Sequence, residues 1–112
     1  MSSTISLSGM SHASTLLSAT ANNVANLVSE GYQAKRVAAT DVAGGGVRSQ
    51  MSVDTTPGPI LLSQEGTFSQ ASNVDLERET VSLLTSTHLY AANLAVLRAE
   101  DEAVGTLLDQ KA

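Results

Sequence analysis

The side chains that could bind a metal or act as a nucleophile are few in this chain of 112 residues. There are two histidines, His12 and His88, and neither has a second histidine or a cysteine three or four residues away. His88 lies one turn from Leu84 on an expected helix, which favours a packing or interface role. Cysteine is absent from the sequence, which excludes disulfides, thiolate zinc sites and a cysteine nucleophile.

Other catalytic patterns are also incomplete. The glycines at 44–46 are followed by Val47 and Arg48, whereas a phosphate-binding loop ends in Gly-Lys-Ser or Gly-Lys-Thr. Serines are abundant, but none lies in a Gly-x-Ser-x-Gly nucleophile elbow. The acidic run at 100–102 is typical of a solvated helix face. We therefore expect no enzymatic activity, no cofactor or metal, and no small-molecule substrate.

Composition and charge narrow the possible partners further. Six basic and eleven acidic residues give a net charge of −5, and the basic residues are not clustered, so a nucleic-acid partner is not expected. No stretch approaches 18 apolar residues, so no membrane insertion is expected. The first residues lack the basic and apolar regions of a secretory signal. If the protein leaves the cytoplasm, we expect export without a cleaved leader.

The N-terminal segment has the periodicity of a helix but no charge between residues 2 and 29. Gly31 is suited to the position after a helix end. Ser, Thr and Asn are modest helix formers, so this helix is expected to be marginal alone and to need a partner. Residues at alternating spacings of three and four form its apolar row: Met10, Ala13, Leu17, Thr20, Val24 and Leu27.

The C-terminal segment has the register of a coiled coil. A helix from about 73 to 109 would be roughly 55 Å long, against roughly 39 Å for the N-terminal one, at 1.5 Å per residue. The N-terminal helix and further copies of the chain are the partners that could cover it. Ser72 or Asn73 is expected to cap its start. The heptad row, spaced by seven throughout, is Leu76, Leu83, Tyr90, Leu97 and Val104.

The middle of the chain reads as strands and turns. Apolar and polar residues alternate from Val47 to Asp54, which predicts a strand with one covered face. The glycines at 44–46 separate it from the segment 34–42, so a hairpin is expected, and 60–62 is a third candidate strand. Altogether we expect a mainly α protein, in which two long terminal helices (1–31 and 73–112) pack as a coiled coil around a small β-hairpin-containing middle segment (32–72).

Both ends of the sequence also carry motifs. At the N-terminal end, Asn22, Asn23, Val24, Ala25, Asn26 and Leu27 are followed by Gly31 and Tyr32. At the C-terminal end, the run from Ser72 to Leu76 continues through Glu79 and Val81 to Tyr90, Asn93, Gly105 and Leu108. In both respects the chain resembles the flagellar axial protein family of bacteria, which includes the rod, hook and hook-associated proteins.

This resemblance implies a structural subunit of the flagellar basal-body rod, located in the periplasm-spanning rod. Such a subunit self-assembles into a helical tube that transmits torque for motility. Its partners would be further copies, other flagellar rod and hook proteins, and the flagellar type III export apparatus. The middle segment of about 40 residues is short for the family, which favours a minimal rod-type member. Thr87, His88 and Leu89 depart from a Gln-Arg pair that many relatives carry.

The expected assembly interface combines the two rows with the motif residues. It consists of Leu17, Asn22, Asn23, Val24, Asn26, Gly31, Tyr32, Leu76, Leu83, Tyr90, Asn93, Leu97, Val104 and Leu108. The asparagines can be interpreted either as a solvated polar face or as hydrogen-bonding groups between subunits, and the second interpretation is favoured. An alternative function is a soluble helical adaptor or export-associated binding protein derived from the same family.

Overall fold

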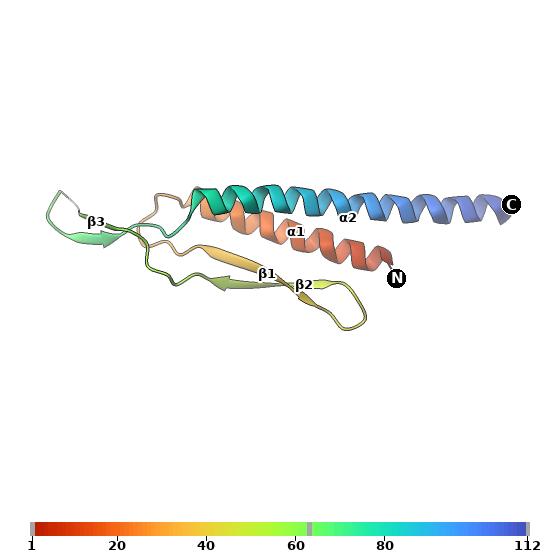
Figure 1. Cartoon of the computed structure of the whole chain (residues 1–112), viewed down its shortest axis with the longest axis horizontal. Coiled ribbons are helices and arrows are strands. Elements are labelled where there is room, and N and C mark those ends of the chain that lie inside the picture. The colour runs from red at the N-terminus through yellow and green to blue at the C-terminus, as the bar shows by residue number, and fades with distance from the viewer. Residues whose placement is uncertain (1, 63, 112) are drawn as a thin grey trace.

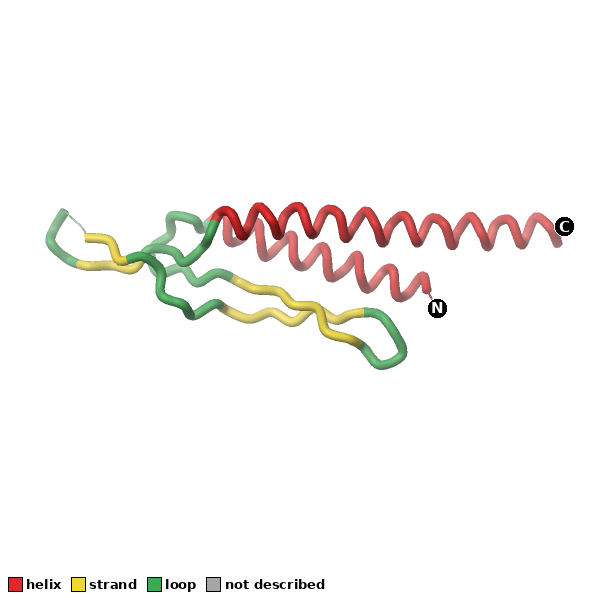
Figure 2. The backbone as a smooth tube through the Cα atoms, viewed as in Figure 1, coloured by secondary structure: helices red, strands yellow, loops and turns green. Residues whose placement is uncertain are grey.

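Two long helices and two small hairpins make up the structure, a computed structural model that describes residues 2–62 and 64–111 (Figure 1). Along the chain, a helix lies at each end and the described strands lie between them in sequence. In space, the two hairpins lie beside and beyond the helix pair (Figure 2). The expected mainly α fold, with paired terminal helices around a β-containing middle, is confirmed. The elements are α1 (Ser2–Ala25), β1 (Lys35–Asp41), β2 (Val47–Val53), β3 (Ile60–Leu62), β4 (Phe68–Gln70) and α2 (Leu76–Lys111).

The molecule is strongly elongated, measuring 79 × 24 × 14 Å along its principal axes. Its radius of gyration is 20.0 Å, whereas a compact domain of this length would have about 13 Å. A chain with this shape buries little apolar surface. Among the described residues, the fully buried apolar side chains are three alanines, Ala13, Ala19 and Ala34.

The two helices run antiparallel and approach each other closely. Asn23 donates a hydrogen bond to Glu79 near one end of the pair. Fourteen residues away on each helix, a Cβ added to Gly9 would lie 2.6 Å from the side-chain amide of Asn93. A side chain at position 9 would therefore force the Asn93 side chain to move, and small side chains along α1 allow the close approach.

The hairpin of β1 and β2 lies on the other side of α1, so that α1 has partners on two sides (Figure 1). Ser8 Oγ accepts a hydrogen bond from the backbone N–H of Val47 (3.1 Å), and His12 Nδ1 is hydrogen-bonded to Ser49 Oγ (2.9 Å). These contacts provide the partner that an uncharged, marginal helix needs. The glycines at 44–46 form the connection of this antiparallel hairpin, as predicted.

The prediction that one face of β2 is covered is only partly correct. Val47 is half-buried, but Met51 and Val53 on the same strand are about half exposed. A two-stranded hairpin packed against one uncharged helix has too little surface above it to cover both strands along their full length.

A second hairpin extends beyond the helix pair at the opposite end from the C-terminus (Figure 1). Strand β3 of this hairpin was predicted. It pairs antiparallel with β4, and Leu62 of β3 lies opposite Phe68 of β4. The strand β4 was not predicted, because Phe68 is the one apolar residue among its three, whereas β3 is a run of three apolar residues. The Pro-Gly-Pro segment at 57–59 precedes this hairpin.

The expected helix ends differ from the observed ones. Helix α1 ends at Ala25 rather than near Glu30, because the Asn26 amide bonds to the carbonyl of Asn22 and to the Ser29 hydroxyl, and so competes with helical hydrogen bonding. Gly31 has a positive φ of 70° as expected, but it follows this turn and not the helix.

At the start of α2, neither Ser72 nor Asn73 caps the helix. The carboxylate of Asp75 accepts a hydrogen bond from the Glu77 N–H (3.1 Å), which makes Asp75 the N-cap. The hydroxyl of Ser72 instead accepts from the Val74 N–H within the preceding turn. The side chain of Asn73 instead bonds to backbone groups of Ala34, Asp54 and Thr56.

Candidate assembly surface

The most fully bonded side chain in the described structure is Asn23, which is only 1% exposed. Its amide nitrogen donates to the carbonyl of Lys35 (2.9 Å) and to Glu79 Oε1 (3.0 Å). Its amide oxygen accepts from the Lys35 N–H (2.8 Å) and from the Tyr32 hydroxyl (3.0 Å). Both amide hydrogens and both oxygen lone pairs are thus used within one chain.

Glu79 connects this amide to an ion-pair network. Its side chain is 1% exposed, and Oε1 accepts from Arg36 Nη1 at 2.8 Å. The other terminal nitrogen of Arg36 lies 3.4 Å from Asp54 Oδ2. The Nε of Arg36 is buried and has no hydrogen-bond partner among the described residues. A buried carboxylate is tolerated here because a cation and an amide both bond to it.

Asn73 connects the same region to the start of α2. Its oxygen accepts from the Ala34 N–H (2.6 Å), and its nitrogen donates to the carbonyls of Asp54 and Thr56, both at 2.8 Å. Its backbone N–H donates to the carbonyl of Tyr32. We call Asn23, Arg36, Asp54, Asn73 and Glu79 the polar cluster. It joins the end of α1, the first hairpin and the beginning of α2.

Two pKa shifts accompany this cluster. Burial, followed by the nearby negative charge of Glu79, raises the pKa of the Tyr32 hydroxyl. Hydrogen bonds from the backbone and side chain of Thr56, together with the Arg36 guanidinium, lower the pKa of Asp54. Both shifts favour the neutral hydroxyl and the ionised carboxylate that these contacts require.

The face that α2 turns toward α1 is polar and not apolar. The residues on this face are spaced by seven and are buried or half-buried; this polar row is Glu79, Ser86, Asn93 and Glu100. Each residue of the predicted apolar row is three or four positions from a residue of this polar row, so the two rows run side by side on the helix surface. Two members of the apolar row, Leu83 and Tyr90, are 43% and 44% exposed. The heptad register predicts α2 correctly, but its apolar positions remain largely uncovered within the chain.

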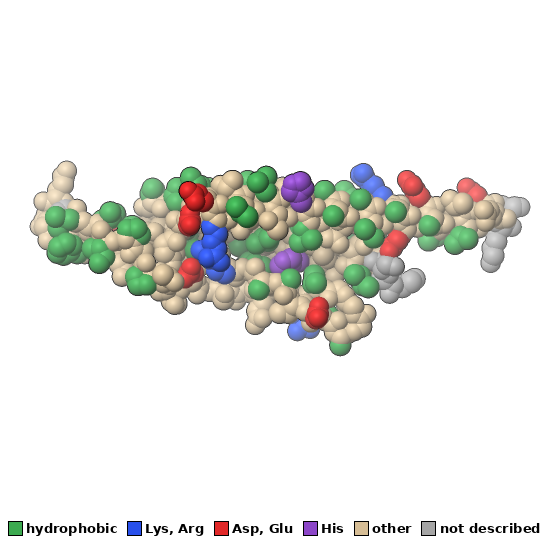
Figure 3. Space-filling model, viewed as in Figure 1, with side chains coloured by type: hydrophobic (Ala, Val, Ile, Leu, Met, Phe, Trp, Pro, Cys, Tyr) green, Lys and Arg blue, Asp and Glu red, His purple; other side chains and the backbone are tan. Residues whose placement is uncertain are grey.

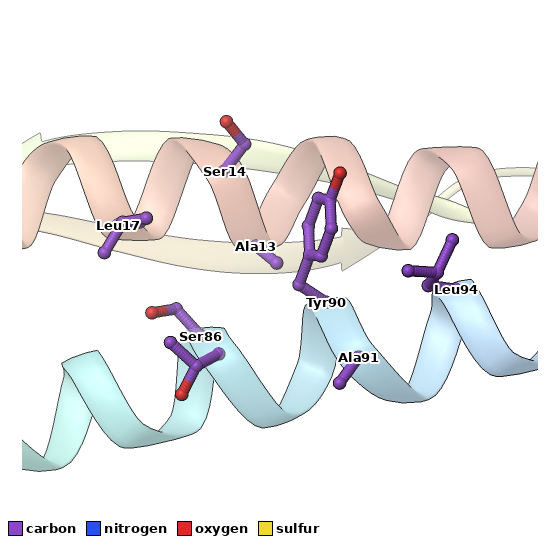
Figure 4. A pocket seen from close by; sticks show the side chains of 8 residues that line it. Ala13, Ser14, Leu17, Ser86, Tyr90, Ala91 and Leu94 are labelled. Atoms are coloured by element: carbon purple, nitrogen blue, oxygen red, sulfur yellow. The ribbon is translucent and has the colours of Figure 1, made fainter.

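The expected apolar row of α1 is also partly buried and partly exposed. Ala13 and Thr20 are buried, whereas Leu17 and Val24 are about two-fifths exposed. The exposed parts of the two rows border a groove of about 370 Å³ between the helices (Figure 4). In that view Tyr90 and Leu94 extend from α2 toward α1, and the Tyr90 ring lies across the α1 ribbon. We call this the interhelical groove; its lining comprises Ala13, Ser14, Leu17, Ser86, Thr87, Tyr90, Ala91 and Leu94.

Helix α2 continues well beyond α1. Asn23 faces Glu79 and Gly9 faces Asn93, which places the first residues of α1 level with about residue 100 of α2. Every side chain from 101 to 110 is exposed, including Val104, Leu107 and Leu108 at 55–66%. We call residues 101–111 the C-terminal extension of α2.

The β3–β4 hairpin exposes a second group of apolar side chains at the other end of the molecule. Hydrophobic side chains gather over this hairpin in Figure 3, and Ile60, Leu62 and Phe68 are 65–74% exposed. An isolated two-stranded hairpin is at best marginally stable in water. Both ends of the elongated chain thus present apolar surface that the chain does not cover.

The residues expected at an assembly interface fall into two groups. The apolar ones are mostly exposed, namely Leu17, Val24, Leu76, Leu83, Tyr90, Val104 and Leu108, whereas Leu97 is half-buried. Of the others, Asn22 and Gly31 are exposed, Asn26 is half-buried in a local turn, and Tyr32 is half-buried and bonded to Asn23. Asn93 faces Gly9, and Asn23 is buried in the polar cluster.

Sequence reasoning missed Arg36, Asp54 and the buried role of Glu79. In the sequence, Glu79 stood out only as part of the C-terminal motif. A signal for its burial does exist, because Glu79, Ser86 and Asn93 form their own seven-residue repeat. Nothing comparable marks Arg36 or Asp54, which lie in a strand and in a loop.

No group of three His, Cys, Asp or Glu residues within 2–62 and 64–111 is arranged to hold a metal ion. Within those same residues, no helix is both long enough and apolar enough to span a membrane. In comparisons with known proteins, no family model and no curated protein matches the chain.

Proposed function

We propose that this protein is a structural subunit of the bacterial flagellar basal-body rod, which self-assembles with further copies and with other axial proteins into a helical tube. The observation that carries the proposal is the exposure of the heptad row on α2. Leu83 and Tyr90 belong to a regular apolar stripe, yet more than two-fifths of each remains open to solvent. A helix stripe of this kind is typically covered by another helix.

Three further features support a structural role. The chain is 79 Å long and only 14 Å thick, which suits an assembly of parallel rods better than a solitary globule. Its polar cluster fixes the position of the helices relative to the first hairpin within one chain. The motif residues Asn23, Tyr32 and Asn73 all belong to or contact this cluster, so the sequence motifs that resemble the axial family define the subunit's shape.

Fractionation of the native bacterium tests this function. An epitope-tagged copy expressed from the native locus is expected to sediment with purified basal bodies, and its deletion is expected to abolish swimming. Recovery of the tagged protein only in the soluble fraction, with motility intact after deletion, would contradict the proposal and favour the adaptor alternative. An untagged strain serves as the control for swimming.

A further inference from the structure

We infer that a cavity beside the first hairpin binds a phosphate group, either as inorganic phosphate or as a phosphate monoester. The cavity lies between α1, β1 and the start of α2 and has a volume of about 230 Å³. Its lining includes Thr20, residues 35–38, Arg78 and Glu79; we call it the edge cavity. One water molecule needs only about 10–15 Å³ of such space, so a phosphate group fits in it together with several waters.

Basic residues gather around the edge cavity. Three of the six basic residues of the chain line it, namely Lys35, Arg36 and Arg78, whereas Glu79 is the one acidic residue of the lining. Glu79 is already bonded to Arg36 at 2.8 Å. Neither Lys35 nor Arg78 forms an ion pair within residues 2–62 and 64–111. Two positive charges therefore remain without a partner around one cavity of an acidic chain, and they favour an anion there.

Two further carboxylates lie beside Arg78, but they belong to a different space. Asp54 and Asp75 line a neighbouring cavity that also includes Arg78. Asp54 accepts a hydrogen bond from the Thr56 N–H, and Asp75 accepts one from the Glu77 N–H at the start of α2. Neither carboxylate lines the edge cavity, so the positive charges there are not neutralised from within its walls.

The backbone of β1 offers hydrogen-bonding groups to the same cavity. The carbonyl of Ala34 accepts from the Asp54 N–H across the hairpin (2.8 Å). In an antiparallel pair such positions alternate with positions whose N–H and carbonyl point to the free edge, and Lys35 and Val37 are of the second kind. At Lys35 both groups are bonded to Asn23. At Val37, which lines the edge cavity, no described side chain takes that place.

Thr20 adds a hydroxyl from α1. It lies three residues before Asn23 and so on the same side of the helix, facing β1. Thr20 is only 4% exposed and lines the edge cavity, but its hydroxyl forms no hydrogen bond with any residue in 2–62 and 64–111. Buried hydroxyl groups in proteins are normally hydrogen-bonded, so this one is an open donor at the wall of a positively charged cavity.

These groups fit phosphate better than other small anions. The N–H and carbonyl of Val37 require a ligand that both accepts and donates a hydrogen bond. Inorganic phosphate keeps at least one proton at neutral pH, and a phosphate monoester keeps one in part of its population, since its second pKa is about 6. Sulfate has no proton to donate. The charges of Lys35 and Arg78 and the Thr20 hydroxyl would then bind the remaining phosphate oxygens.

Thermal unfolding of the full-length protein, followed by circular dichroism, tests this site. Inorganic phosphate, glycerol phosphate and sulfate are each titrated at constant ionic strength. Sulfate is the matched control, because phosphate and sulfate both stabilise proteins non-specifically by exclusion from their surfaces. We expect a saturable rise in melting temperature with phosphate that sulfate does not produce; equal rises would overturn the inference. Whichever of inorganic phosphate and glycerol phosphate binds more tightly identifies the free ion or the ester as the source.

A charge variant shows whether the effect arises in the edge cavity. Arg78→Gln is expected to weaken phosphate binding roughly tenfold, measured by broadening of the phosphorus NMR signal. The matched control is Arg98→Gln, which removes the same charge from an exposed position about 30 Å further along α2. Because charges are screened over about 10 Å at 0.1 M salt, this variant should change binding less than about twofold. Equal losses would mean diffuse attraction to the whole chain and would overturn the inference.

A hydroxyl variant tests the buried wall of the site. Thr20→Val keeps the shape of the side chain and removes its donor, so we expect phosphate binding to weaken roughly fivefold. Unchanged binding in a variant that retains its helices by circular dichroism would overturn the assigned site. Both variants are measured on the purified chain, so their outcome does not depend on whether the protein sediments with basal bodies.

Discussion

The polar cluster buries polar side chains, whereas the two ends of the molecule expose apolar side chains. In the cluster, buried polar groups such as Asn23 and Glu79 are bonded within the chain. At the ends, large apolar side chains such as Phe68 and Leu107 are exposed. Soluble monomers usually show the reverse arrangement, with large apolar groups buried and charged groups in water.

The contrast indicates that hydrogen bonds and apolar contacts have different roles in this chain. Directional hydrogen bonds set the mutual positions of α1, the first hairpin and α2, because each bond fixes a distance and an angle. The apolar rows contribute little to the fold of a single chain and remain available to other molecules. Substitutions in the polar cluster should therefore change the free energy of unfolding more than substitutions in the apolar rows.

Removing the central amide should have the largest effect. Asn23→Ala leaves both backbone groups of Lys35, the Tyr32 hydroxyl and Glu79 without their partner. Each buried group left unpaired costs about 1–3 kcal/mol, and some will recover water, so we expect a loss of roughly 3–5 kcal/mol. Urea denaturation followed by circular dichroism measures it. The control is Asn22→Ala on the exposed neighbour, expected to change stability by less than about 0.5 kcal/mol; similar losses from both would contradict a special role for Asn23.

Neutralising the buried carboxylate should have the next largest effect. Glu79→Gln keeps an oxygen that can accept from Asn23, but it removes the negative charge that faces Arg36. Breaking a buried ion pair costs about 3–5 kcal/mol, and since Arg36 is partly exposed and keeps Asp54 nearby, we expect about 2 kcal/mol. The same urea titration measures this loss. Glu77→Gln, on an exposed side chain two residues away, is the matched control, and equal effects would mean that the ion pair does not stabilise the chain.

The periodicity of the sequence predicts much of the fold, but it does not predict the polar cluster. The heptad from Leu76 to Val104 predicts α2, and the glycines at 44–46 predict the first hairpin. The same heptad does not show which face α2 turns toward α1, because the strongest apolar row is not the one that packs there. Small residues such as Gly9 decide the facing side, and their effect depends on how closely the helices approach.

The cluster requires information about distance that a sequence lacks. Asn23 and Glu79 are 56 residues apart along the chain, but their bonded side-chain atoms are 3.0 Å apart. Asparagine at a helix end is also consistent with a solvated face. Arg36 and Asp54 are brought together by the register of β1 and β2, in which Arg36 lies opposite Ser52. A strand pattern predicts a hairpin but does not specify which long side chains will meet across its end.

A charge on the apolar row should affect the fold little and assembly strongly. Complete burial of a leucine is worth about 1.5–3 kcal/mol, and Leu83 is 43% exposed, so we expect Leu83→Asp to cost about 1 kcal/mol of unfolding free energy. We also expect swimming to be lost while protein levels remain normal. Thr85→Asp, on the far side of α2, is expected to swim. Normal swimming by the Leu83 variant would show that this row is not an assembly surface.

Acid should weaken the polar cluster by a smaller amount, and the sign follows from the pKa of Asp54. That pKa is lowered in the folded chain from an ordinary value of 3.8, chiefly by the hydrogen bond from the Thr56 N–H. The carboxylate therefore stabilises the fold above the unfolded-state value, and this contribution is lost as the pH falls below it and through the folded-state pKa. Urea titrations between pH 6 and 2.5 should show stability falling below about pH 4. Asp54→Asn should be less stable at pH 6 and show a shallower decline, because it has no proton to take up at that position. An unchanged slope in this variant would mean that Asp54 lies outside the set of contacts that hold the helices to the hairpin.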